Sequence, residues 1–290
     1  MKRNLIGYGP NPPDYDWPNG AKVAVNFVLN YEEGAELTPV NGDDSCENYG
    51  GEFPLSRKEK NERSLSMESL YEYGSRAGVW RLLRLFEKNN VPLTLFATGL
   101  ALQLNPPLCQ YLTQKAYDIA GHGWRWIDQS QLSAPEEKRH MIKTIATIEQ
   151  LTNQRIKGWY SGRKSNHTRR LLKEIGGFLY DSDSYADDIP YYDDDRHLII
   201  PYNLVTNDFR FCTQPGFSGP ADFYLTLKNT LDYLVSENRW SVMTIGLHPR
   251  ISGYPARAQV IKEFLNYLKS KPNVWVCRRV DIAQFCMNHL

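Results

Sequence analysis

Hydrophobic residues along the chain fall into two kinds of segment that alternate with each other. The first kind is a short, nearly continuous apolar run, as at 21–30 (AKVAVNFVLN), 93–97 and 241–247. Such runs are typical of strands buried on both faces of a parallel sheet. The second kind repeats apolar residues at helical spacing, as at 77–89 and 256–269. The alternation predicts strand–helix–strand units around a parallel sheet.

The remaining segments extend this pattern. Further strands are expected at 198–202 and 274–276, with short ones before the polar segments 158–163 and 180–192. Further helices are expected at 107–120, 136–151, 168–175, 221–236 and 281–287. About seven such units with no linker predict one α/β barrel domain over residues 1–290.

Three segments fit neither pattern. Residues 1–20 are expected to form an ordered surface arm, and 35–63 a long irregular excursion. A loop of that length is usually a lid, a binding loop or an oligomer contact. Residues 66–76 are dense in aromatic and charged side chains, which predicts that they buttress a loop or an interface.

Charge and cysteine content narrow the class of partner. Lys and Arg number 34 against 33 Asp and Glu, which gives no case for nucleic acid or an anionic membrane and favours a small neutral ligand. The five cysteines are scattered and odd in number, so neither a disulfide framework nor a zinc ribbon is indicated. Because the chain also shows no signal peptide and no membrane-length apolar run, we expect a cytoplasmic protein with reduced thiols.

Two adjacent carboxylates, Glu32 and Glu33, follow the first predicted strand. The carboxyl ends of barrel strands are where such folds carry their chemistry. Neighbouring strand residues point to opposite sides, so at most one can face a pocket unless the strand breaks at Gly34. A solvated acidic loop is the alternative interpretation.

Histidines follow two other predicted elements, the helix at 107–120 and the strand at 241–247. Two histidines four residues apart would suggest metal ligands, but here His122 is followed by Trp126, which can only wall a flat ligand. A single histidine among core aromatics is the alternative for His122. His248 ends the strand at 241–247 and is placed to act as a general acid or base.

Other polar residues at strand ends are candidates for binding a substrate. In the segment 158–163, Trp159, Tyr160 and Arg163 can stack on and hydrogen-bond a planar polar ligand. A structural salt bridge is the alternative for Arg163. The carboxylates of 180–192 lack the EF-hand spacing, so support of the site and loop capping are favoured over Ca²⁺ binding. The remaining substrate-binding candidates are Asp183, Asn207 and Asp208.

The order of these segments resembles the polysaccharide deacetylase family, and more closely its metal-independent allantoinase branch. The most specific matches are FVLNYEEG from Phe27, SMESLYEYGSRAGVWR from Ser66, HGWRWID from His122, GWYSGR from Gly158 and TNDFRF from Thr206. The resemblance covers nearly the whole chain and implies a distorted (β/α)7 barrel. Departures from the branch at residues 164–167, 193–195, Pro249 and Tyr254 leave the substrate range open.

The resemblance also bears on the metal. The deacetylases carry two aspartates after the first strand and an HxxxH turn, and these places hold Glu32, Glu33, His122 and Trp126 here. The place of the deacetylase motif arginine falls on Tyr160. One histidine and one glutamate are too few for a catalytic zinc, which normally has three protein ligands. We therefore expect no metal and no cofactor.

The function that the resemblance implies is hydrolysis of the ring amide of allantoin to allantoate, in purine catabolism. Glu32, or alternatively Glu33, is expected to take the proton from water, and His248 to protonate the departing nitrogen. His122 and Arg163 are expected to orient the ureide, with Trp126 and Trp159 on its faces. A zinc-dependent deacetylase of N-acetylated sugars and a non-catalytic ureide-binding barrel are the alternatives. The resemblance also implies a homotetramer.

Overall fold

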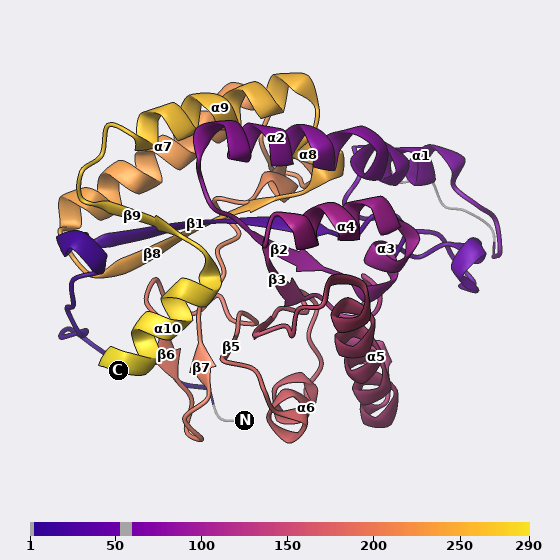
Figure 1. Cartoon of the computed structure of the whole chain (residues 1–290), viewed down its shortest axis with the longest axis horizontal. Helices are drawn as coiled ribbons and strands as arrows, with labels where there is room; N and C mark the ends of the chain where they lie inside the picture. The colour runs from indigo at the N-terminus through magenta and orange to yellow at the C-terminus, as the bar shows by residue number, and fades with distance from the viewer. Residues whose placement is uncertain (1–2, 53–59) are drawn as a thin grey trace.

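The computed structural model describes residues 3–52 and 60–290, and its strands join one sheet (Figure 1). The strand order is β6-β7-β5-β4-β3-β2-β1-β8, with β9 also paired to β1. The pairings are parallel apart from that of β6 with β7. The strands are β1 (Val23–Tyr31), β2 (Thr94–Ala97), β3 (Asp118–Gly121), β4 (Gly158–Trp159), β5 (Tyr180–Asp181), β6 (Tyr191–Tyr192), β7 (Leu198–Ile199), β8 (Ser241–Leu247) and β9 (Val274–Cys277).

Helices cover the sheet, and Figure 1 shows α2, α7 and α9 side by side along one face, over β1 and β8. Helix α5 lies farther along the sheet beside α3, α4 and α6. The helices are α1 (Leu65–Tyr73), α2 (Val79–Asn89), α3 (Gly99–Leu104), α4 (Pro106–Gln114), α5 (Ala134–Thr152), α6 (Thr168–Ile175), α7 (Pro220–Glu237), α8 (Pro249–Ser252), α9 (Pro255–Leu268) and α10 (Arg279–His289). This α/β architecture is the predicted distorted barrel.

Strand β1 is the centre of the fold, and all nine of its residues are buried. One edge pairs with β8, while the other pairs with β9 at Val23–Asn26 and with β2 at Val28–Tyr31. Since β1, β2, β3 and β8 are parallel, their carboxyl ends meet at one edge of the sheet. Glu32, His122 and His248 each follow one of these strands directly, so the topology brings them together.

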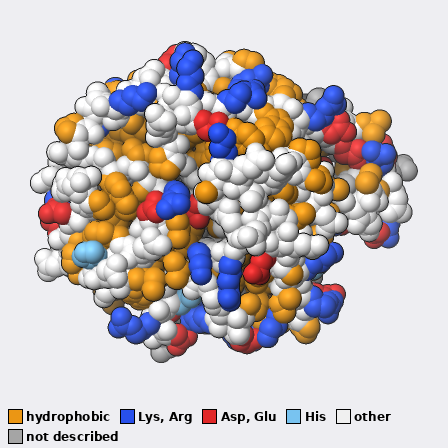
Figure 2. Space-filling view, in the orientation of Figure 1, with side chains coloured by type: hydrophobic (Ala, Val, Ile, Leu, Met, Phe, Trp, Pro, Cys, Tyr) orange, Lys and Arg blue, Asp and Glu red, His pale blue; other side chains and the backbone are white. Residues whose placement is uncertain are grey.

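One prediction about local structure needs correction. The predicted helix 107–120 is wrong in its second half, because α4 ends at Gln114 and Asp118–Gly121 forms strand β3. The segment 66–76 is itself helical and packs on α8, as a buttress of that region would. Residues 1–2 of the predicted arm and 53–59 of the predicted excursion lie outside the described residues. Figure 2 shows positive and negative side chains interspersed on the visible face, and no described helix has both the length and the apolar composition needed to cross a membrane.

A five-residue π-helix, η3 (Gly74–Gly78), joins α1 to α2 and packs against α8 and Glu33. A Cβ atom at Gly78 would lie 2.1 Å from the backbone oxygen of Pro249, so only glycine permits this close approach to α8. A Cβ atom at Gly74 would likewise collide with the carboxyl group of Glu33. π-Helical turns of this kind often occur at functional sites.

Candidate active site

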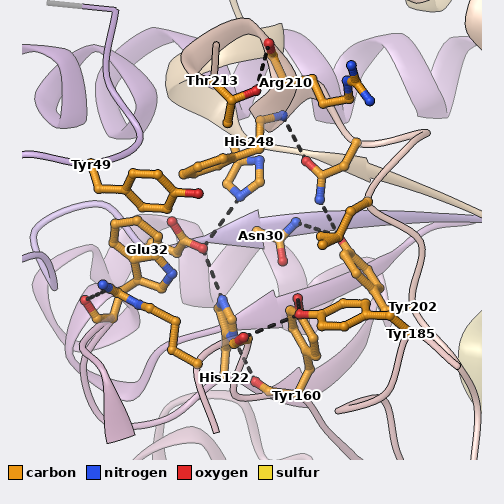
Figure 3. Close-up of a pocket in the computed structure, with 16 residues that line it drawn as sticks. Asn30, Glu32, Tyr49, His122, Tyr160, Tyr185, Tyr202, Arg210, Thr213 and His248 are labelled. Atoms are coloured by element: carbon orange, nitrogen blue, oxygen red, sulfur yellow. Dashed lines mark hydrogen bonds and ion pairs between the residues drawn. The ribbon is translucent and has the colours of Figure 1, made fainter. Parts of the chain in front are cut away.

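A cavity of about 350 Å³ opens at the carboxyl ends of the central strands (Figure 3). Its walls combine two histidines and one carboxylate with amides, phenols and other aromatic rings. The lining residues are Asn30, Glu32, Tyr49, His122, Trp126, Tyr160, Gly162, Arg163, Tyr185, Tyr202, Leu204, Asn207, Phe209, Arg210, Thr213 and His248. A volume of this size suits a small ligand.

Glu32, His122 and His248 form what we call the charged wall of the cavity (Figure 3). Oε1 of Glu32 lies 3.0 Å from Nε2 of His122 and 3.6 Å from Nε2 of His248. On its other side, Nδ1 of His122 lies 2.6 Å from the carbonyl oxygen of Tyr160. A carbonyl oxygen can only accept a hydrogen bond, so Nδ1 carries hydrogen and Nε2 faces the carboxylate.

His248 is held by a second buried carboxylate. Its Nδ1 lies 2.6 Å from Oδ1 of Asp208, and its backbone N–H donates to Oδ2 of the same residue at 2.7 Å. Burial lowers the pKa of His248, but the negative charges of Asp208 and Glu32 outweigh that effect and raise the pKa to about 9. The imidazolium form therefore dominates at neutral pH, as a general acid requires.

Arg250, on α8, completes the surroundings of Glu32. Its Nη1 lies 2.8 Å from Oε2 of Glu32 in an ion pair whose geometry is not that of a hydrogen bond. Burial alone would raise the pKa of Glu32, but the charges of Arg250 and His248 and the hydrogen bond with His122 hold it well below its usual range. Glu32 is consequently ionised at neutral pH, inside a cavity where a carboxylate can accept a proton from water.

The neighbouring carboxylate has a different environment. Glu33 is buried beside η3, its Oε2 accepts the backbone N–H of Glu32 at 2.8 Å, and it is absent from the cavity lining. Burial raises the pKa of Glu33 to about 7. A pKa near 7 would suit a general base. The side chain of Glu33 does not line the cavity, however, which disfavours Glu33 as the alternative general base.

Aromatic and cationic side chains also line the cavity. The guanidinium of Arg163 stacks 4.2 Å from the centre of the Trp126 ring and donates to the backbone oxygen of Trp126 at 2.9 Å. Arg163 also lies 3.8 Å from the carboxylate of Glu47, so the ion pair considered as an alternative coexists with its place in the lining. The ring of Tyr49, from the irregular excursion, lies parallel to that of Trp126 at 6.4 Å.

Comparisons with known proteins identify the family of the chain. A family model described as Polysaccharide deacetylase matches residues 59–177. A Schizosaccharomyces pombe protein with the provisional name of polysaccharide deacetylase is 36% identical over 308 aligned residues, which cover 97% of this chain and 96% of the relative. The chain belongs to the polysaccharide deacetylase family.

Two solved structures of this family or its fold resemble the chain over its whole length. One is a "probable Polysaccharide deacetylase" from Pseudomonas aeruginosa PAO1, with 46% identity, a TM-score of 0.97, and coverage of 100% of this chain and 99% of that one. The other is Puue allantoinase, with 44% identity, a TM-score of 0.97, and coverage of 100% and 98%. These two neighbours share one architecture but have different names, so the fold alone does not identify the substrate of this chain.

The polysaccharide deacetylase resemblance implies a zinc site, and the residues present do not fit one. Trp126 stands in the place of the second histidine, and the guanidinium of Arg250 is already paired with Glu32. Among the described residues, no three His, Cys, Asp or Glu side chains are arranged to hold a metal ion. We therefore derive no step through a metal.

Three further residues that the sequence suggested for direct substrate contact lie outside the lining. Trp159 is buried in the main core against Phe178, because it points away from the cavity that its neighbour Tyr160 lines. Asp183 accepts the backbone N–H groups of Ser161 and Gly162, and Asp208 holds His248. These carboxylates position the site and do not line the cavity.

Asn30, Tyr202 and Arg250 are among the residues of the site that sequence reasoning missed. A signal for Asn30 was present, since residues two apart on a strand share a face and Asn30 precedes Glu32 by two. No comparable signal marked Arg250, which lies in a four-residue helix after β8. Tyr202 follows β7 and reaches the cavity beside Tyr160, with ring centres 4.5 Å apart.

Proposed function

We propose that the chain hydrolyses a ring amide of a cyclic ureide, with allantoin as the candidate substrate and allantoate as the product. The observation that carries this proposal is the charged wall, in which an ionised Glu32 lies between two histidines at the head of a small cavity. A similar solved structure is that of an allantoinase, which supports the same substrate class.

The proposed reaction is a single hydrolysis that uses a carboxylate base. Glu32 accepts a proton from water while the water oxygen forms a bond to the ring carbonyl carbon. The imidazolium of His248 gives its proton to the ring nitrogen as the carbon–nitrogen bond breaks, so the products are a carboxylic acid and an N–H group. The guanidinium of Arg163, which lines the cavity, stabilises the developing oxyanion, a contribution typically worth about 10²–10³ in rate.

Zinc-dependent deacetylation of N-acetylated sugars is the main alternative for this family. It is disfavoured by Trp126 and by the ion pair between Arg250 and Glu32, which leave too few metal ligands. Among the described residues the cavity has room for a small ring, and the Tyr49, Trp126 and Phe209 side chains that line it contact one another. A non-catalytic ureide-binding protein would not need a histidine held by Asp208 beside an ionised glutamate.

The proposal is tested by incubating the purified chain with allantoin and, separately, with an N-acetylglucosamine oligomer. We expect allantoate to form and no acetate to be released. Release of acetate without turnover of allantoin would favour the deacetylase alternative. Binding of allantoin with no hydrolysis would favour the non-catalytic one.

A further inference from the structure

Asn30, Asn207 and Tyr202 line the cavity with neutral side chains, and we call these three residues the amide wall. Figure 3 labels Asn30 and Tyr202 in this wall. Both amide side chains donate to the same phenol: Nδ2 of Asn30 lies 3.0 Å and Nδ2 of Asn207 lies 3.2 Å from Oη of Tyr202. All three residues line the cavity while being almost fully buried.

Backbone groups fix the orientation of both amides. Nδ2 of Asn30 also donates to the carbonyl oxygen of Leu247 at 3.2 Å, and a carbonyl oxygen cannot accept from Oδ1 if the amide is reversed. Oδ1 of Asn207 accepts the backbone N–H of Phe209 at 2.8 Å, which directs its nitrogen toward Tyr202. The amide hydrogens therefore have defined places.

This arrangement leaves one donor and one acceptor unused. A phenol oxygen that accepts two N–H groups keeps its own hydrogen for donation, and Tyr202 has no acceptor for it among the described residues. Oδ1 of Asn30 likewise has no hydrogen-bond donor among the described residues, although Nδ2 of the same side chain makes two hydrogen bonds. Buried polar groups normally have partners, so this pair is suited to a ligand.

We propose that Oδ1 of Asn30 accepts a hydrogen bond from the N–H group of a cyclic amide, and that the hydroxyl of Tyr202 donates one to the adjacent C=O group. The proposal rests on the proposed function and narrows it to substrates whose amide is cis. In a five-membered ring the N–H and C=O groups point to the same edge, where one neighbouring acceptor and donor can bind both. In an open secondary amide, such as that of an N-acetyl sugar, the two groups point in opposite directions because the bond is trans.

Calorimetric titration of the full chain with three probes tests the proposal. Hydantoin presents the cis edge, 1,3-dimethylhydantoin keeps the ring and both carbonyls but lacks N–H, and N-acetylglucosamine has a trans amide. We expect hydantoin to bind at least about tenfold more tightly than the other two, because loss of a partner leaves a buried polar group unpaired. Equal affinity for hydantoin and its dimethyl derivative would overturn the proposal.

The matched variants are Tyr202→Phe and Tyr180→Phe, which each remove one buried hydroxyl. Tyr180 is fully buried, is absent from the cavity lining, and has no hydrogen-bond partner for its hydroxyl among the described residues. We expect Tyr202→Phe to weaken hydantoin binding about 10–100-fold and Tyr180→Phe to change it less than about twofold. Unchanged binding in Tyr202→Phe would overturn the proposal.

A parallel allantoin assay separates this proposal from the proposed function. Tyr202-dependent binding of hydantoin in a chain that does not hydrolyse allantoin would support the amide wall and defeat the proposed function. Hydrolysis of allantoin by wild type with an unchanged KM in Tyr202→Phe would support the proposed function and defeat the proposal for the amide wall.

Discussion

The charged wall and the amide wall face the same cavity but are held in different ways. In the charged wall, Glu32 and His248 depend on further ionised groups, Arg250 and Asp208, which shift their pKa values in opposite directions. In the amide wall, neutral side chains are fixed by the backbone groups of Leu247 and Phe209. Protonation should therefore govern bond breaking, whereas ligand orientation should depend little on pH near neutrality.

The largest effect is expected from Glu32→Gln, which removes the proton acceptor and keeps the shape of the side chain. Loss of a general base costs up to about 10⁴ in rate, so kcat for allantoin should fall by about that factor. The matched control is Glu33→Gln, the same change one residue away, where kcat should change by less than about tenfold. Equal losses in the two variants would contradict the division of roles between these carboxylates.

A smaller effect, with a diagnostic pH dependence, is expected from Asp208→Asn. The wild-type kcat/KM should fall as pH rises through about 9, because His248 then loses the proton that it donates. Without the charge of Asp208 the pKa of His248 falls, so the basic limb should move to lower pH and kcat/KM should drop by about 10² at pH 8.

The pH profiles of kcat/KM for wild type and Asp208→Asn measure this shift. Asp222→Asn is a suitable control, because Asp222 accepts the backbone N–H groups of Ser218 and Gly219 at the start of α7 and is absent from the cavity lining. An unmoved basic limb in Asp208→Asn would show that His248 does not supply the proton.

The smallest effect concerns stability. The pKa of Glu33 is about 7 in the folded chain and near its ordinary value of 4.5 when unfolded, so its protonated form stabilises the fold at low pH. That contribution is fully present below about pH 4.5 and is lost as pH rises through about 7. Glu33→Gln should therefore raise the free energy of unfolding by about 3 kcal/mol at pH 8.5 and leave it nearly unchanged at pH 4, as urea denaturation would measure.

The apolar runs were sufficient to predict the order of the main strands and helices. The run at 21–30 contains most of β1, and the segment 168–175 is α6 with the same bounds. Both were predictable because the spacing of apolar residues in the sequence reflects which side chains are buried. The helix predicted over 107–120 failed where the strand is only four residues long, since so short an apolar run has no clear period.

The site was less predictable than the fold, because whether a side chain faces the cavity depends on the residue at which each strand ends. Trp159 and Tyr160 are adjacent, and the sequence does not say which one faces the cavity. The ion pair between Arg250 and Glu32 joins segments more than 200 residues apart, so only the fold brings it together. Glu32 and His248 were accessible to sequence reasoning because each directly follows a predicted strand, and His122 because its segment resembles the family's HxxxH turn.

The central claim is that the charged wall hydrolyses a cyclic ureide with a carboxylate base and no metal. The most direct test is kcat/KM for allantoin measured on the chain after exhaustive chelation, with metal content determined on the same sample, and again after addition of zinc. We predict full turnover in the stripped chain and no gain with zinc. Loss of turnover on chelation that zinc restores would contradict the claim.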